Sequence, residues 1–184
     1  TEAYVILAIR DEVSAPYIYA GFQRPPSREA LKGWIEKQDI AAIEACFDRI
    51  PVKPGDVFLI PGGRPHALGE GILMLEIMEP SDLAVRFEFE RGGFVIPEEA
   101  RFMGRGIETA LDVFSFDPVP AHKVDAEFRC QPRVEVSDAQ GNCLETLVGP
   151  DKTDCFVVKR ATVKGNFARK EDAFFYGVVV AGSG

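Results

Sequence analysis

The feature that most limits the folds open to this chain is a series of short apolar segments that end at turn-forming residues. These segments are rich in β-branched and aromatic residues and are bounded by Gly, Pro, Asp or Ser, which is typical of strands in a β domain. In the first half of the chain they cover residues 3–9, 16–22, 57–60, 72–78 and 83–89. The pattern therefore predicts a mainly β fold.

Two short helices are expected to interrupt these strands, as an insertion at residues 27–48. Ser27 and Asp39 are good helix N-caps, because their side chains accept hydrogen bonds from free backbone N–H groups. Apolar residues at helical spacing follow each cap, among them Leu31 and Ile43.

A change of pattern in the middle of the chain predicts a domain boundary. Gly and Pro residues bracket residues 92–124, which carry one predicted helix near 107–114. Strand-like segments resume in residues 125–184, including 133–136, 155–164 and 174–181. Both ends of the sequence fall at strand-like segments, and we interpret it as an interior part of a longer chain.

Composition argues against two classes of partner. The chain has 21 Lys and Arg against 29 Asp and Glu, a net charge of −8, so we expect no nucleic-acid partner. No apolar run approaches the roughly 20 residues that cross a bilayer, so we expect no membrane partner. The four cysteines form no CxxC pair and are expected to be reduced thiols, which favours a cytoplasmic location. The sequence does not indicate an oligomeric state.

The most informative motif is GDVFLIPGGRPH at residues 55–66. A strand ends at Pro61, the glycines allow a tight turn, and His66 opens the next strand. This spacing resembles the second sequence motif of the cupin β-barrels, whose histidine points into the barrel mouth, where it can bind a metal. The chain has Glu70 where the cupin pattern has Asn. The alternative interpretation is an ordinary hairpin with a half-buried histidine.

The residues around this motif resemble the class I phosphomannose isomerases. The resemblance includes Thr1 and Glu2, the helical insertion, the strand that follows His66, and the segments at 156–165 and 174–184. It implies a cupin (jelly-roll) β-barrel at residues 1–91 with the insertion at 27–48, a connector at 92–124, and a partial C-terminal cupin-like β domain at 125–184.

The resemblance also implies a zinc site. Carried over by position, Glu2 and His66 resemble two of the family's four Zn²⁺ ligands. The other two ligands precede the glutamate in the family and are not in this sequence. The second histidine, His122, lies in the connector, and we do not expect it to replace them. Two protein ligands alone would hold zinc weakly.

Three further residues are candidates for the pocket. Arg86 resembles the family's active-site arginine, where it would hold phosphate or stabilise negative charge on sugar oxygens; strand alternation also allows an outward, solvated position. Glu76 lies in an apolar strand, where a carboxylate needs a partner: either a structural ion pair or, as we expect, a sugar in the pocket. Asp82 matches an acidic pocket position but is also a common turn residue.

The function that the resemblance implies is the interconversion of mannose 6-phosphate and fructose 6-phosphate. A proton would move between C1 and C2 through an enediolate, with Zn²⁺ as the Lewis acid. The catalytic base is not assigned, because the family's lysine would fall before Thr1. One alternative is a non-catalytic sugar-binding or regulatory cupin. Another is a different metal-dependent cupin enzyme, such as a dioxygenase, which usually needs more histidines on the metal.

Overall fold

A computed structural model describes residues 1–81 and 84–182 of the chain. The chain divides into two compact units, Thr1–Arg129 and Cys130–Gly184, and each is described by itself. The fold is mainly β with little helix. In the described part of the chain, no helix has both the length and the apolar character that a membrane crossing requires.

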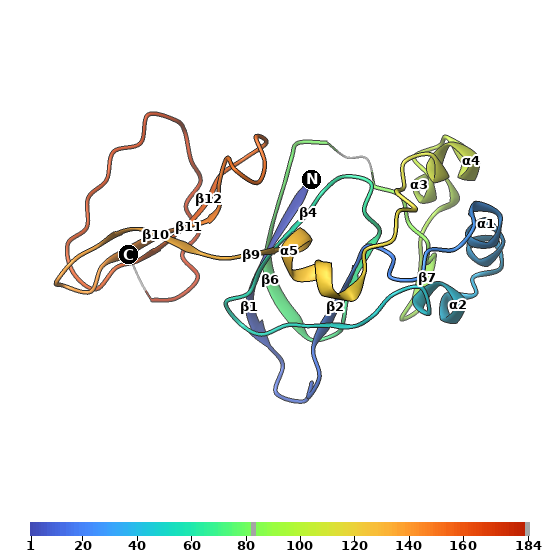
Figure 1. Ribbon diagram of the computed structural model, residues 1–184, viewed down its shortest axis with the longest axis horizontal. Helices are drawn as coiled ribbons and strands as arrows, with labels where there is room; N and C mark the ends of the chain where they lie inside the picture. The colour runs from blue at the N-terminus through green and yellow to red at the C-terminus, as the bar shows by residue number, and fades with distance from the viewer. Residues whose placement is uncertain (82–83, 183–184) are drawn as a thin grey trace. The chain divides into compact units, whose positions relative to one another are not determined.

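Two sheets form the β part of unit 1 (Figure 1), in the orders β6-β1-β4-β9 and β3-β2-β5, and the last residue of β9, Cys130, is the first residue of unit 2. Strand β1 pairs antiparallel with β4 and β6, and β2 pairs antiparallel with β3 and β5. A small hairpin of β7 and β8 follows. The strands are β1 (Glu2–Ile9), β2 (Tyr17–Ala20), β3 (Ile50–Pro51), β4 (Val57–Ile60), β5 (His66–Leu68), β6 (Ile72–Met78), β7 (Glu90–Arg91), β8 (Phe94–Val95) and β9 (Arg129–Cys130).

The main core of unit 1 is built by side chains from both sheets. Strand alternation places every second residue of β1 on one face, and antiparallel pairing brings the matching residues of β4 and β6 to the same face. The buried cluster consists of Tyr4, Ile6, Ile18, Ala20, Ile50, Val52, Phe58, Ile60, Val119, Val124 and Phe128. Leu68, Ile72 and Met74 pack against it.

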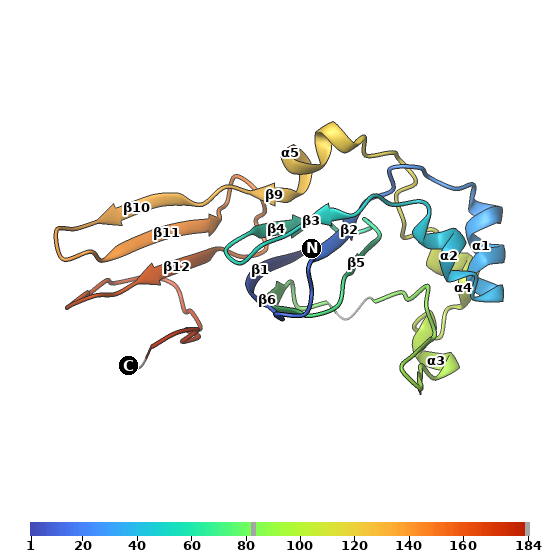
Figure 2. The same cartoon turned by 90° about the horizontal axis from the view of Figure 1, so that it is seen from below.

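The helices of unit 1 are short. They are α1 (Arg28–Lys37), α2 (Ile40–Glu44), α3 (Glu98–Arg101), α4 (Gly106–Leu111), the 3₁₀ helix η1 (Ala121–Lys123) and α5 (Val124–Phe128). The predicted caps are confirmed: Ser27 Oγ accepts from Ala30 N and Asp39 Oδ1 from Ala42 N, each at 3.1 Å. In Figure 2, α1, α2 and α4 lie together at one end of unit 1, where Leu31, Ile35 and Leu111 join a second buried cluster.

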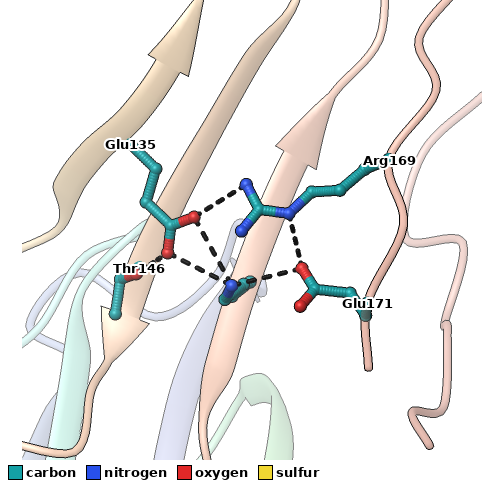
Figure 3. A network of polar contacts seen from close by, with 5 residues as sticks. Glu135, Thr146, Arg169 and Glu171 are labelled. Carbon is teal, nitrogen blue, oxygen red and sulfur yellow. Dashed lines mark hydrogen bonds and ion pairs between the residues drawn. The ribbon is translucent and has the colours of Figure 1, made fainter. Parts of the chain in front are cut away.

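Unit 2 contains one antiparallel sheet in the order β10-β11-β12. Its strands are β10 (Arg133–Ser137), β11 (Cys143–Val148) and β12 (Val158–Thr162). Figure 3 shows Glu135 of β10 accepting from Thr146 of β11 and pairing with Arg169 of the segment after β12. Lys159 of β12 lies between Glu135 and Glu171 at 3.3 Å from each carboxylate. This network ties residues 169–171 to the sheet.

The predicted strand at residues 83–89 is wrong for residues 84–89, and Leu83 lies outside the described residues. The side chain of Gln38 makes two hydrogen bonds of the kind that a neighbouring strand would make. Its Nε2 donates to the Phe87 carbonyl at 2.9 Å, and its Oε1 accepts from Phe89 N at 2.7 Å. Phe87 and Phe89 pack against the cluster of α1 and α2. Because a side chain satisfies these backbone groups, the segment does not need to join a sheet.

The predicted strand at residues 174–181 is also not formed over these residues. Its aromatic side chains are exposed, Phe174 by 88% and Tyr176 by 91%, and the described part of unit 2 pairs no strand with it. Pairing among the described strands does not close the sheets of unit 1 into a barrel, so the cupin barrel stays a prediction.

Candidate active site

A tight turn between β4 and β5 places His66. Gly63 has a φ of +78°, a backbone conformation that L side chains rarely adopt. A Cβ at this position would lie 2.7 Å from the Val113 carbonyl oxygen, and Ser115 N donates to the Gly63 carbonyl at 2.9 Å. The turn is therefore packed against residues 113–115, and β5 begins at His66, opposite Ala20 of β2.

Three polar side chains converge at one end of the unit 1 core. Glu2 and Tyr4 lie two residues apart on β1, so both side chains are on the core face of the strand. Glu2 Oε2 lies 3.2 Å from His66 Nε2. The Tyr4 hydroxyl donates to the same Glu2 oxygen at 2.5 Å and lies 2.7 Å from His66 Nε2. Residues more than 60 positions apart in the sequence thus share one small cluster.

The other ring nitrogen of His66 is held by the backbone. Nδ1 lies 2.9 Å from the Arg64 carbonyl oxygen, and an N–H at this position donates to that acceptor. Such a bond fixes the ring orientation and turns Nε2 toward Glu2, which is the arrangement expected of a histidine that binds a metal.

The electrostatics of the cluster couple its three side chains. The hydrogen bond with His66 lowers the pKa of Glu2 to about 2, since it outweighs the opposing effect of burial and is aided by the Tyr4 hydroxyl. Burial acts to lower the pKa of His66, but the bonds to Glu2 and to the Arg64 carbonyl raise it on balance. Burial, together with the Glu2 carboxylate, raises the pKa of Tyr4, so the phenol is neutral at neutral pH.

The spacing of Glu2 and His66 fits two ligands of one zinc ion. Two donor atoms bound at about 2.0–2.1 Å with tetrahedral angles are about 3.3 Å apart, and the observed separation is 3.2 Å. Across residues 1–81 and 84–182, no three His, Cys, Asp or Glu side chains form a possible metal group. The described residues therefore offer two carboxylate or imidazole ligands, and not a complete set of four.

A pocket of about 530 Å³ lies beside this pair, and Glu2, His66 and Arg86 are among its lining residues. Its walls also include the turn at residues 61–65 and apolar side chains such as Phe87 and Phe114. Arg86 is exposed, and its Nη1 donates to the Ala100 carbonyl at 3.3 Å.

The arginines of this pocket differ in their partners. Arg64 pairs with Glu127 at 2.8 Å, and Arg91 pairs with Glu88 at 2.7 Å. For Arg86, by contrast, the structure gives no ion pair to any described carboxylate.

The remaining candidates do not join this pocket in the described residues. Glu76 lies on β6 directly opposite Tyr4, but its side chain is exposed and is not among the pocket-lining residues. Its carboxylate still acts electrostatically on Tyr4 and His66, where it helps to raise the pKa of each group. Its role in substrate binding stays a prediction. Asp82 lies outside the described residues. His122 lies in η1, as an exposed residue of the connector.

Sequence reasoning missed Tyr4. Its position could have been found, because a residue two places after Glu2 on a strand must share its face. That its hydroxyl reaches both Glu2 and His66 depends on the distance between the two sheets, which no local pattern reports.

The fold and this cluster define a β-sheet protein with a carboxylate–imidazole pair at metal-ligand spacing, on the wall of a pocket that also carries a cation. The chain is similar in sequence to proteins named mannose-6-phosphate isomerase. The one from Streptococcus mutans serotype c is 33% identical over 116 residues, which are 62% of this chain and 33% of the relative. One from Bacillus subtilis is 48% identical over 92 residues, which are 50% of this chain and 27% of the relative. The matched segments thus cover about a third or less of these two relatives.

A solved structure has a similar fold. The crystal structure of the mannose 6-phosphate isomerase from Bacillus subtilis matches with a TM-score of 0.61 and 23% identity, over 90% of this chain and 46% of that chain. At this identity the likeness concerns the fold alone. No protein-family model matches the chain.

Proposed function

We propose that this chain carries one part of a class I mannose-6-phosphate isomerase of the cupin superfamily, which interconverts mannose 6-phosphate and fructose 6-phosphate. The observation that carries the proposal is the Glu2–His66 pair, 3.2 Å apart in a pocket that also contains Arg86. The names of the similar proteins support the choice of substrate. A cytoplasmic location is the corresponding expectation.

Glu2 Oε2 and His66 Nε2 would hold Zn²⁺, and the Arg64 carbonyl would keep the imidazole oriented. When bound, Zn²⁺ supplies Lewis-acid polarisation of the sugar oxygens. The isomerisation moves a proton between C1 and C2 of the open-chain sugar, through an enediolate.

Arg86 would stabilise negative charge, either on the phosphate or on the enediolate oxygens, because its guanidinium carries a fixed positive charge in the pocket. The apolar wall that includes Phe87 and Phe114 would reduce the water around the reacting carbons. Glu76 and Asp82 stay predicted substrate-binding residues.

The test compares the chain's two histidines. His66→Asn removes one proposed ligand, and His122→Asn changes an exposed histidine of the connector. In the full-length protein that contains this chain, we expect His66→Asn to lower kcat/KM for fructose 6-phosphate formation by about 100-fold or more, and His122→Asn to leave it unchanged. A chelator should abolish turnover, and added Zn²⁺ should restore it. Full activity of His66→Asn, or activity that resists chelation, would contradict the proposal.

A non-catalytic sugar-binding cupin is the second candidate, because the described residues offer two metal ligands and Glu70 departs from the cupin pattern. This alternative predicts saturable binding of mannose 6-phosphate by calorimetry, with no fructose 6-phosphate formed when zinc is bound.

A further inference from the structure

We propose that the Tyr4 hydroxyl is a positioning group that holds Glu2 and His66 at metal-ligand spacing. The inference rests on the metal site proposed above. Tyr4 would not contact metal or substrate; it would act through the Glu2 carboxylate.

The argument begins with the geometry of three atoms. Tyr4 Oη, Glu2 Oε2 and His66 Nε2 form a triangle with sides of 2.5, 2.7 and 3.2 Å. The hydroxyl has one proton, which it donates to Glu2. If Glu2 and His66 both turned toward a shared metal, a carboxylate oxygen would still accept from Tyr4. The hydroxyl can therefore orient Glu2 with or without the metal.

Burial makes Tyr4 a rigid support. Its side chain is 3% exposed and belongs to the main core cluster with Phe58 and Ile60, so its ring has little freedom to move. The side chains of Glu2 and His66 are each 27% exposed. Glu2 also stands at the first position of β1. A fixed donor thus restrains a less restricted carboxylate.

His66 has a separate restraint. Its Nδ1 is held by the Arg64 carbonyl at 2.9 Å, whereas the hydrogen bonds of the Glu2 carboxylate run to Tyr4 and to His66 itself. Loss of the Tyr4 hydroxyl would leave the His66 imidazole oriented. It would release the Glu2 carboxylate from one of its two hydrogen bonds. The expected effect is therefore on ligand geometry, and removal of partners of this type commonly lowers metal affinity by about 10–100-fold.

The first experiment measures Zn²⁺ binding to the full-length protein that contains this chain, by isothermal titration calorimetry. Tyr4→Phe removes the hydroxyl and keeps the buried ring. Tyr17→Phe is the control, since it removes another tyrosine hydroxyl of unit 1, on a ring that packs against Tyr19. We expect Tyr4→Phe to weaken zinc binding by about 10-fold or more, and Tyr17→Phe to leave it within about twofold. Unchanged or tighter binding by Tyr4→Phe would overturn the proposal, as would a tyrosinate absorption band on zinc addition.

The second experiment needs no metal. The chain has two histidines, so the ring signals of His122 serve as an internal reference for those of His66 in nuclear magnetic resonance spectra. Tyr4→Phe should shift the His66 ring signals and leave the His122 signals and the melting temperature nearly unchanged. Identical His66 signals in the two proteins, or an unfolded variant, would overturn a positioning role.

These measurements separate the inference from the proposed function. Turnover of mannose 6-phosphate by the wild type, with equal zinc affinity in Tyr4→Phe, would overturn the role of Tyr4 alone. Weaker zinc binding in Tyr4→Phe, with no turnover by the full-length wild type, would overturn the isomerase alone and support the role of Tyr4. A full-length wild-type protein that does not bind zinc would overturn both.

Discussion

Single residues of the β4–β5 turn determine where His66 stands. Gly62 and Gly63 are adjacent and chemically identical, yet their surroundings differ. A Cβ at Gly62 would have its nearest neighbour at 3.9 Å, whereas a Cβ at Gly63 would lie 2.7 Å from a backbone oxygen at a positive φ. The turn that presents the histidine therefore requires glycine at one position and tolerates a side chain at the other.

This difference predicts the effects of two alanine substitutions. Gly63→Ala should lower the free energy of unfolding by about 2 kcal/mol or more, because the strained φ and the contact with the Val113 carbonyl both act against the native turn. Gly62→Ala should change it by no more than about 0.5 kcal/mol. Urea unfolding of both variants checks this, and equal midpoints would contradict it.

Among the elements, the described strands of unit 2 are joined by charge as well as by backbone pairing. Glu135 of β10 meets Thr146 of β11 and Lys159 of β12, and it also meets Arg169 beyond the last strand. One carboxylate thus contacts both other strands of the sheet and the segment that follows (Figure 3).

The network predicts a pH dependence for the stability of unit 2. The Thr146 hydroxyl, with Lys159 and Arg169, lowers the pKa of Glu135 below its ordinary value of 4.5. A lowered folded-state pKa means that the stabilisation is fully present above the unfolded-state pKa and is lost as the pH falls through the folded-state pKa. Glu135→Gln should therefore lower stability at pH 7 and reduce the loss of stability below about pH 4.5. Denaturation across pH 2–7 tests this, and parallel profiles would count against it.

At the scale of the whole molecule, unit 1 depends on the core that its two sheets share. Phe58 belongs to this cluster: it is fully buried and pairs in register with Tyr4. The same packing that stabilises unit 1 therefore also supports the residue that contacts Glu2 and His66.

Shortening a side chain of this core should lower the free energy of unfolding. Phe58→Ala should destabilise the protein by about 3–5 kcal/mol, because it removes apolar contacts and leaves a cavity. Phe94→Ala, at a phenylalanine that is 69% exposed, should cost no more than about 0.5 kcal/mol. Thermal unfolding distinguishes them, and similar losses in both variants would show that the shared core does not dominate stability.

Local chemistry along the chain was sufficient to predict the short strands, the caps at Ser27 and Asp39, and the turn before His66. These features depend on neighbouring residues, through strand propensity, hydrogen bonds to the backbone and allowed φ values. The same reasoning failed at residues 84–89, where the side chain of Gln38, distant in sequence, bonds to the Phe87 carbonyl and the Phe89 N–H.

Long-range packing determined which side chains of the candidate site are in contact. The family resemblance suggested that Glu2 and His66 share a site, but the pairing of β1 with β4 and of β2 with β5 brings them within 3.2 Å and adds Tyr4 between them. The pairing of β6 with β1 likewise places Glu76 opposite Tyr4. Strand order and sheet spacing arise from contacts across the whole core, so no segment alone specifies them.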